Sequence, residues 1–83
     1  MTEPEIYKAL NEIFRRLFKD PNLTVRPETR AEDVRGWDSL AHVRLILACE
    51  KRCGVRFKTS EISEFQNVGD LVRLVQKKLL LKQ

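Results

Sequence analysis

The chain has 83 residues, of which 42% are hydrophobic and 34% charged, and its formal net charge is +4. This length holds one small domain, and the composition is that of a folded globular chain rather than a disordered one. No apolar run approaches the roughly 20 residues that a membrane helix needs, and the N-terminal segment is acidic where a secretory signal would be basic. We therefore expect a single domain over residues 1–83, cytoplasmic and without membrane insertion.

The first predicted helix runs from about Glu3 to Lys19. Apolar residues recur there at helical spacing, and Thr2 with Glu5 forms a capping-box start. Pro21 ends the pattern because proline disfavours helical geometry in the residue before it. Residues 20–37 show no sustained period and are predicted to form a long loop, packed on the core through Leu23, Val25, Val34 and Trp37.

A second helix is predicted to begin at Ser39 and to stop at Gly54. Its inward side chains are expected to be Leu40, Val43, Ile46, Leu47 and Cys49 or Cys53. An extended connector over residues 55–58 and a short helix over 59–65 follow, with Ile62 and Phe65 facing the core. Asn67 and Asp70 then start a final helix with a wide apolar stripe. The predicted fold class is all-α, a small four-helix bundle with three longer helices and one short one.

The two cysteines, Cys49 and Cys53, lie four positions apart within the second helix. They form no disulfide framework, and no second pair completes a zinc site. We predict two buried thiols and no metal site.

The most informative segment is Gly36-Trp37-Asp38-Ser39-Leu40, which places a serine hydroxyl where the loop gives way to the second helix. The unpaired amides and the dipole of a helix N-terminus favour an anion there, such as a phosphate ester on Ser39. Taken by itself, the segment is also explained by Asp38 or Ser39 acting only as an N-cap.

This order of elements resembles the acyl carrier protein family over nearly the whole chain. The resemblance rests on Gly36-Trp37-Asp38-Ser39-Leu40, the spacing of Val43, Ile46 and Leu47, the exit Gly54-Val55-Arg56-Phe57, and Val68-Gly69-Asp70-Leu71. It implies that a phosphopantetheinyl transferase, using coenzyme A and magnesium, attaches 4′-phosphopantetheine to Ser39. The thiol of that arm would carry cargo as a thioester, so the domain would be a monomeric carrier with no catalytic residue of its own.

The resemblance also implies a partner surface on the second helix, for an acyl or aminoacyl ligase and a downstream transferase or synthase. By position its residues are Asp38, Leu40, Ala41, Arg44, Glu50 and Lys51. The family's second helix is usually acidic, whereas here Arg44, Lys51 and Arg52 outnumber Glu50. Since like charges hinder docking, we expect a specialised carrier rather than the one serving bulk fatty-acid synthesis. The cargo, whether fatty acyl or aminoacyl, stays open.

Three other functions compete with the carrier interpretation. A serine hydrolase would need His42 to activate Ser39, but no orienting acid and no nucleophile elbow is present. A small helical nucleic-acid-binding protein is consistent with the positive charge of residues 39–83, which include nine basic and four acidic side chains. These cations do not, however, form a dense stripe. The third is a carrier-like fold that is never modified and acts only as an interaction module. We expect no nucleic-acid partner.

Overall fold

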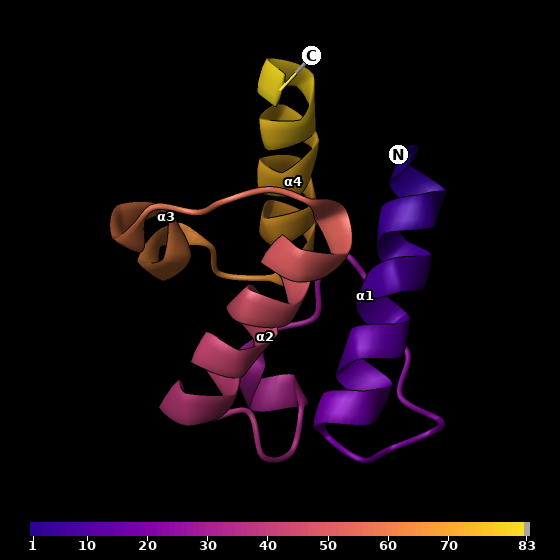
Figure 1. Ribbon diagram of the computed structural model, residues 1–83. Coiled ribbons are helices and arrows are strands. Elements are labelled where there is room, and N and C mark those ends of the chain that lie inside the picture. Colours follow the sequence, from indigo (N-terminus) through magenta and orange to yellow (C-terminus); the bar gives the residue numbers. More distant parts are fainter. Residues whose placement is uncertain (83) are drawn as a thin grey trace.

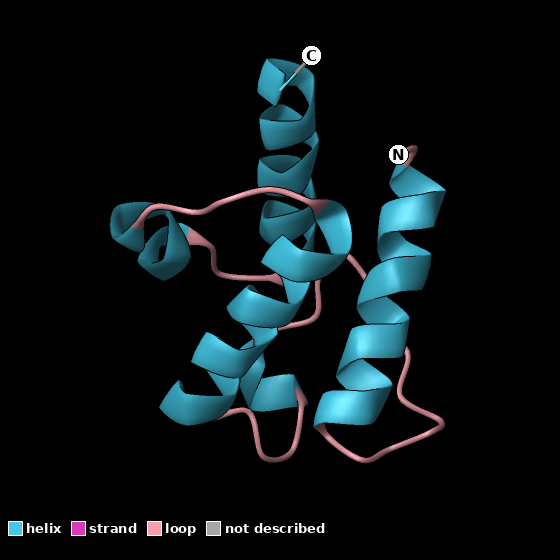
Figure 2. Ribbon diagram, viewed as in Figure 1, coloured by secondary structure: helices cyan, strands magenta, loops and turns pink. Residues whose placement is uncertain are grey.

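The computed structural model describes residues 1–82, and over that range it contains helices and loops but no strand (Figure 2). Its helices are α1 (Glu3–Leu17), a short 3₁₀ helix η1 (Ala31–Asp33), α2 (Ser39–Cys53), α3 (Thr59–Glu64) and α4 (Val68–Lys82). The predicted bundle of three longer helices and one short one is confirmed (Figure 1). The single domain was predicted to include Gln83, which lies outside the described residues. None of the described helices combines the length and apolar character needed to cross a membrane.

Helix α1 begins with the predicted capping box. The Glu5 carboxylate accepts the amide of Thr2 at 2.7 Å, and the Thr2 hydroxyl oxygen accepts the amide of Glu5 at 3.4 Å. The helix ends at Leu17, two residues before the predicted end. The reason is local, because Lys19 takes a left-handed backbone angle, φ 53°, as the chain turns toward Pro21.

The hydrophobic core is shared by α1, α2 and α4, with α1 packed against both other helices. Its largest fully buried side chains are Ile6, Leu10, Phe14, Leu45, Val68, Leu71, Val72 and Val75. Their spacing of three and four residues along each helix places them on one face, which is why these faces meet in the interior.

Helix α2 is rotated relative to the predicted orientation. Ile46, Cys49 and Cys53 are buried as predicted, and Leu45 joins them. The prediction was wrong for Leu40, Val43 and Leu47, whose side chains are 61%, 53% and 59% exposed. Two apolar faces compete on this helix, and the core of α1 and α4 accommodates only the one that carries Leu45 and Cys49.

The long loop is packed rather than free, as predicted. Val25 and Val34 are buried, and Leu23 and Trp37 are half-buried against the core. Polar side chains of α1 hold its backbone in place. Asn11 Oδ1 accepts the amide of Val25 at 2.7 Å, and Arg15 Nε donates to the Leu23 carbonyl at 2.6 Å.

The loop also meets the start of α4. The amides of Val68 and Gly69 donate to the carbonyls of Thr29 and Pro27, each at 2.8 Å. These bonds satisfy first-turn amides that a helix cannot pair internally. Asn67 Oδ1 accepts the amide of Asp70 at 2.8 Å, so the predicted start of this helix is confirmed.

Helix α3 is short and is held to α4 by an ion pair. The Glu61 carboxylate lies 2.7 Å from Lys78 Nζ, and the two side chains are only 21% and 18% exposed. The same carboxylate accepts the amide of Lys58 at the start of α3. The Lys78 ammonium and this amide hold the pKa of Glu61 below its usual value.

Gly69 offers a test of the contact between the loop and α4. A Cβ atom at this position would lie 2.9 Å from the Pro27 carbonyl oxygen. This oxygen belongs to the backbone and cannot move away by a side-chain rotation. We expect Gly69→Ala to lower the free energy of unfolding by about 1 to 3 kcal/mol, as overpacking does. Alanine's higher helix propensity, about 1 kcal/mol, acts in the opposite direction.

Urea unfolding followed by circular dichroism measures this change. Lys77→Ala, at an exposed site on the same helix, is the control and should change stability by less than about 0.5 kcal/mol. A Gly69→Ala protein as stable as the parent chain would show that the loop does not approach α4 this closely.

Candidate functional site

Ser39 is the first residue of α2 and Asp38 is its N-cap. Asp38 Oδ1 accepts the amide of Ala41 at 2.8 Å, so the aspartate alone performs the capping role. The Ser39 side chain is exposed and makes no hydrogen bond to any residue in 1–82. The hydroxyl at this helix start is therefore free to react.

The backbone around Ser39 favours a negative charge. Within the described chain, no acceptor takes the amides of Ser39 and Leu40. These free donors and the positive end of the helix dipole would stabilise an anion linked to the serine oxygen. The residues present thus fit a phosphodiester at Ser39.

Trp37 anchors the segment that leads into the site. Its ring meets that of Phe14 edge-on, with centroids 5.2 Å apart, and lies 6.1 Å from that of Phe18. Gly36, with φ 89°, makes the turn that brings the indole down onto α1. The packing role predicted for Trp37 is confirmed, and it fixes the position of Asp38 and Ser39 on the body of the protein.

His42 is half-buried and contacts both the loop before α2 and helix α3. Its Nδ1 lies 3.1 Å from Trp37 Nε1, and its Nε2 lies 3.2 Å from the Ile62 carbonyl oxygen. Its ring also stacks between those of Trp37 and Phe65, at centroid distances of 6.1 and 4.9 Å. Local sequence patterns do not indicate this role, because Ile62 and Phe65 lie 20 or more positions away along the chain.

The hydrogen bonds of His42 also define its tautomer. An indole nitrogen can only donate, so Nδ1 is the acceptor and Nε2 carries the proton that goes to Ile62. Both ring nitrogens are occupied within the protein, and neither is available to take a proton from Ser39. This arrangement argues against the serine hydrolase. The described residues contain no cluster of histidine, cysteine, aspartate and glutamate that could hold a metal ion.

The predicted partner residues fall into two groups. Asp38, Leu40, Arg44 and Lys51 are exposed, whereas Ala41 and Glu50 are half-buried. Glu50 Oε2 accepts the amide of Phe57 at 2.8 Å, which ties its carboxylate to the connector after α2. The outward face of α2 is accordingly more basic than its sequence indicates.

Comparison with known proteins agrees with this geometry. A family model described as a phosphopantetheine attachment site matches residues 8–75. The chain belongs to the acyl carrier protein family. Acyl carrier proteins carry cargo and are not enzymes, and 4′-phosphopantetheine is their covalent cofactor. They work with a transferase and with enzymes of synthesis.

Individual relatives cover most of this carrier. It is 33% identical over 72 residues to an acyl carrier protein of Acidothermus cellulolyticus, spanning 87% of this chain and 86% of the relative. It is 29% identical over 76 residues to that of Thermobifida fusca, spanning 92% and 96%. The solution structure of a holo acyl carrier protein from Geobacter metallireducens superposes with a TM-score of 0.84 at 42% identity, covering 92% of this chain and 87% of that one.

The role of His42 as a connector can be measured. Replacing it by alanine leaves the Trp37 indole and the Ile62 carbonyl without partners, and we expect a loss of about 1 to 3 kcal/mol in the free energy of unfolding. Trp37 is the only tryptophan, so its fluorescence reports the change. The amides of α3 should also exchange faster with solvent.

The matched variant is His42→Gln, whose amide both accepts and donates a hydrogen bond and should recover part of the loss. Unchanged exchange in α3 on His42→Ala would show that the imidazole does not hold this helix.

Proposed function

We propose that Ser39 is the residue to which 4′-phosphopantetheine is attached in this carrier. The observation that carries the proposal is the exposed hydroxyl at the first position of α2, which has no hydrogen-bond partner among residues 1–82 and lies next to an aspartate that already caps the helix. The matched family model spans this residue. The other two serines, Ser60 and Ser63, lie in short α3, and the Ser63 hydroxyl donates to the Ser60 carbonyl.

The attached group supplies a terminal thiol that holds cargo as a thioester. The protein's own contribution is to present and position the arm. Trp37 holds the start of α2 against α1, and the first-turn amides would stabilise the negative charge of the phosphodiester. A tethered substrate meets a partner's active site at high effective concentration without any new contact.

The partners we propose are a phosphopantetheinyl transferase, an acyl or aminoacyl ligase, and a downstream transferase or synthase. The surface that meets them includes Asp38, Leu40, Arg44 and Lys51, which are exposed beside and beyond Ser39 on α2. Its positive charge supports a specialised carrier, since partners that select an acidic helix would be repelled. We further propose that the protein acts as a cytoplasmic monomer.

The attachment residue is tested by intact mass. The purified chain, incubated with coenzyme A, magnesium and a phosphopantetheinyl transferase of broad specificity, should gain the mass of a single phosphopantetheine. Ser39→Ala should gain nothing, because the acceptor oxygen is missing.

Ser60→Ala is the control, an exposed serine outside the site, and it should be modified as fully as the parent chain. If the parent gains no mass, the unmodified interaction module becomes the better account. If Ser39→Ala is still modified, another residue is the acceptor.

Modification should also change the thiol chemistry of the protein. Cys49 is fully buried, and burial raises its pKa to about 12, while burial also raises the pKa of Cys53. Since the thiolate is the reactive form, both cysteines should react slowly with a disulfide reagent near neutral pH. The modified protein should show a single fast-reacting thiol, that of the arm.

Ellman titration in native buffer and in denaturant separates these thiols, and the two cysteines should appear only on unfolding. A fast thiol in the unmodified native protein would contradict the burial of Cys49 and Cys53.

A further inference from the structure

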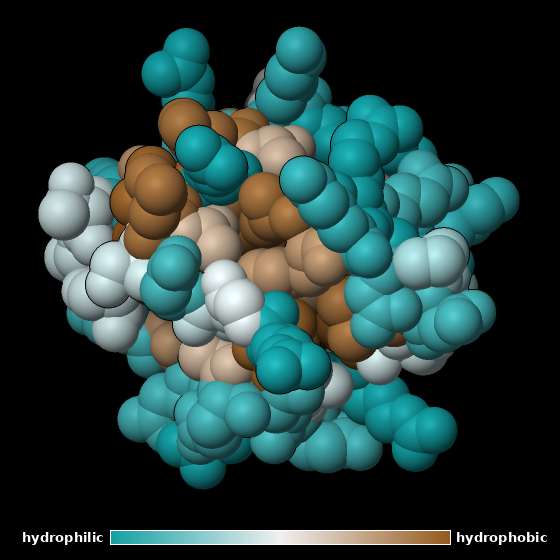
Figure 3. Space-filling model, turned by 90° about the horizontal axis from the view of Figure 1, so that it is seen from below, coloured by the Kyte–Doolittle hydropathy of each residue, from teal (hydrophilic) through white to brown (hydrophobic). Residues whose placement is uncertain are grey.

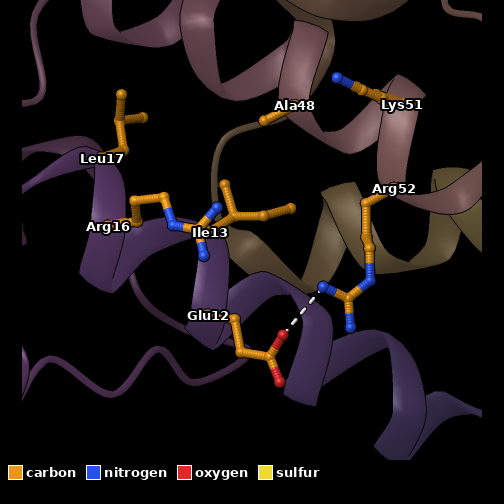
Figure 4. Close-up of a pocket in the computed structure, with 7 residues that line it drawn as sticks. All are labelled: Glu12, Ile13, Arg16, Leu17, Ala48, Lys51 and Arg52. Atoms are coloured by element: carbon orange, nitrogen blue, oxygen red, sulfur yellow. Dashed lines mark hydrogen bonds and ion pairs between the residues drawn. The ribbon is translucent and has the colours of Figure 1, made fainter.

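A groove runs between α1 and α2 on the outside of the bundle (Figure 4). Its volume is about 520 Å³. The residues that line it are Glu12, Ile13, Arg16, Leu17, Ala48, Lys51 and Arg52. Ile13, Leu17 and Ala48 are half-buried and form its apolar surface, while the four charged residues are exposed around it. We call this the α1–α2 groove.

The charges of the α1–α2 groove are not balanced. Arg52 lies 2.8 Å from Glu12 and forms an ion pair between the two helices, drawn in Figure 4. Arg16 and Lys51 form no ion pair with any residue in 1–82. Two uncompensated cations, one from each helix, therefore flank an accessible apolar surface.

The outward face of α2 continues this pattern toward Ser39. Leu40, Arg44, Leu47 and Lys51 follow one another at steps of four, three and four residues, which places them in one row along the helix. The row alternates apolar and cationic side chains, and all four are exposed. Arg44, like Lys51, has no ion-pair partner among the described residues.

Apolar surface is also visible where α2 begins. Figure 3 shows hydrophobic side chains gathered between hydrophilic ones on the face seen from below, the end at which α1 ends and α2 starts in Figure 1. Exposed apolar side chains rimmed by charge are typical of surfaces that bind another protein.

We propose that the α1–α2 groove and the outward row of α2 together form one docking surface for an acidic partner protein that inserts an apolar side chain into the groove. The partner would place carboxylates opposite Arg16, Arg44 and Lys51. Charge complementarity selects this chemistry, because an uncompensated cation gains most from an anionic counterpart. The inference extends the proposed partner surface of α2 to α1, and so it rests on the proposed carrier function.

A protein fits this surface better than a nucleic acid does. The phosphate backbone requires many closely spaced cations, whereas this row alternates each cation with an exposed leucine. A phosphate backbone also offers no apolar group that could fill the half-buried groove. It suits a leucine or aromatic anchor, the kind of residue on which binding energy concentrates at protein interfaces.

The test titrates the unmodified ¹⁵N-labelled chain with a synthetic amphipathic peptide whose helix carries leucines on one face and glutamates beside them. The amides of Ile13, Leu17 and Ala48 should shift, and the affinity should fall with rising salt. A twin peptide with lysine at every glutamate should cause no shift. Arg16→Glu combined with Lys51→Glu should weaken binding about tenfold, since both cations then repel the peptide.

The matched control is Arg26→Glu combined with Lys77→Glu, two exposed cations in the loop and on α4, which gives the same net charge. It should bind the acidic peptide as the parent does. If both double variants bind the acidic peptide equally weakly, the loss follows from net charge alone and the proposal is overturned. Chemical-shift changes confined to amides outside the groove would also overturn it.

Displacement of the peptide by an equimolar DNA duplex or RNA hairpin would assign the surface to nucleic acid and equally overturn it. The titration does not depend on modification of Ser39. If the chain accepts phosphopantetheine but does not bind the acidic peptide, the docking surface is overturned and the proposed function stands. If it binds the peptide but accepts no phosphopantetheine, the carrier function is overturned and the surface belongs to an unmodified interaction module.

Discussion

The hydrogen bond from the Trp37 indole to the His42 imidazole joins the loop that precedes Ser39 to the first turn of α2 that follows it. Trp37 belongs to the loop and packs on Phe14 of α1, while His42 belongs to α2 and contacts the Ile62 carbonyl of α3 and the ring of Phe65, which directly follows α3. One aromatic chain thus crosses the molecule from α1 to the end of α3. The serine lies between its two central members in the sequence. This row of aromatic side chains therefore sets the position of Ser39 relative to the whole bundle.

Asp38 and Ser39 have different roles at the start of α2, and this leaves the serine hydroxyl available for modification. A helix needs an acceptor for its first amides, and a serine at this point would ordinarily supply it. Here the Asp38 carboxylate does so, which leaves the Ser39 hydroxyl exposed and without a hydrogen bond within the described part of the chain. The same helix end then provides free amides and a positive potential. Capping and modification are compatible because they use neighbouring residues.

The surface around this site differs in charge from what the family resemblance implies. Glu50 is the only acidic residue within α2, and its carboxylate is bound to the Phe57 amide. Arg44 and Lys51 form no ion pair with any residue in 1–82, and Arg16 of α1 lines the same α1–α2 groove as Lys51. Partner choice in a carrier depends on such a surface, because the protein performs no chemistry of its own. The charge pattern accordingly bears on which enzymes it serves.

Much of the fold was predictable because its signals are local. The capping box at Thr2, the break at Pro21, the cap at Asp38 and the stop at Gly54 each depend on residues within a few positions of one another. The start of α2 at Ser39 was predicted for the same reason. Its chemical meaning came from the resemblance, since a capping aspartate and a serine before a helix are common.

The sequence by itself determined the four α-helices, the residues at which they begin and the position of the candidate serine. The tertiary structure alone decided which apolar face of α2 is buried. Leu40, Val43 and Leu47 have the spacing of a core face, but Leu45 and Cys49 fill the space between α1 and α4. The tertiary structure alone also placed His42 between Trp37 and Phe65, and brought Arg16 of α1 and Lys51 of α2 to one groove. These contacts join residues far apart in the chain, and local periodicity contains no information about which helix lies opposite.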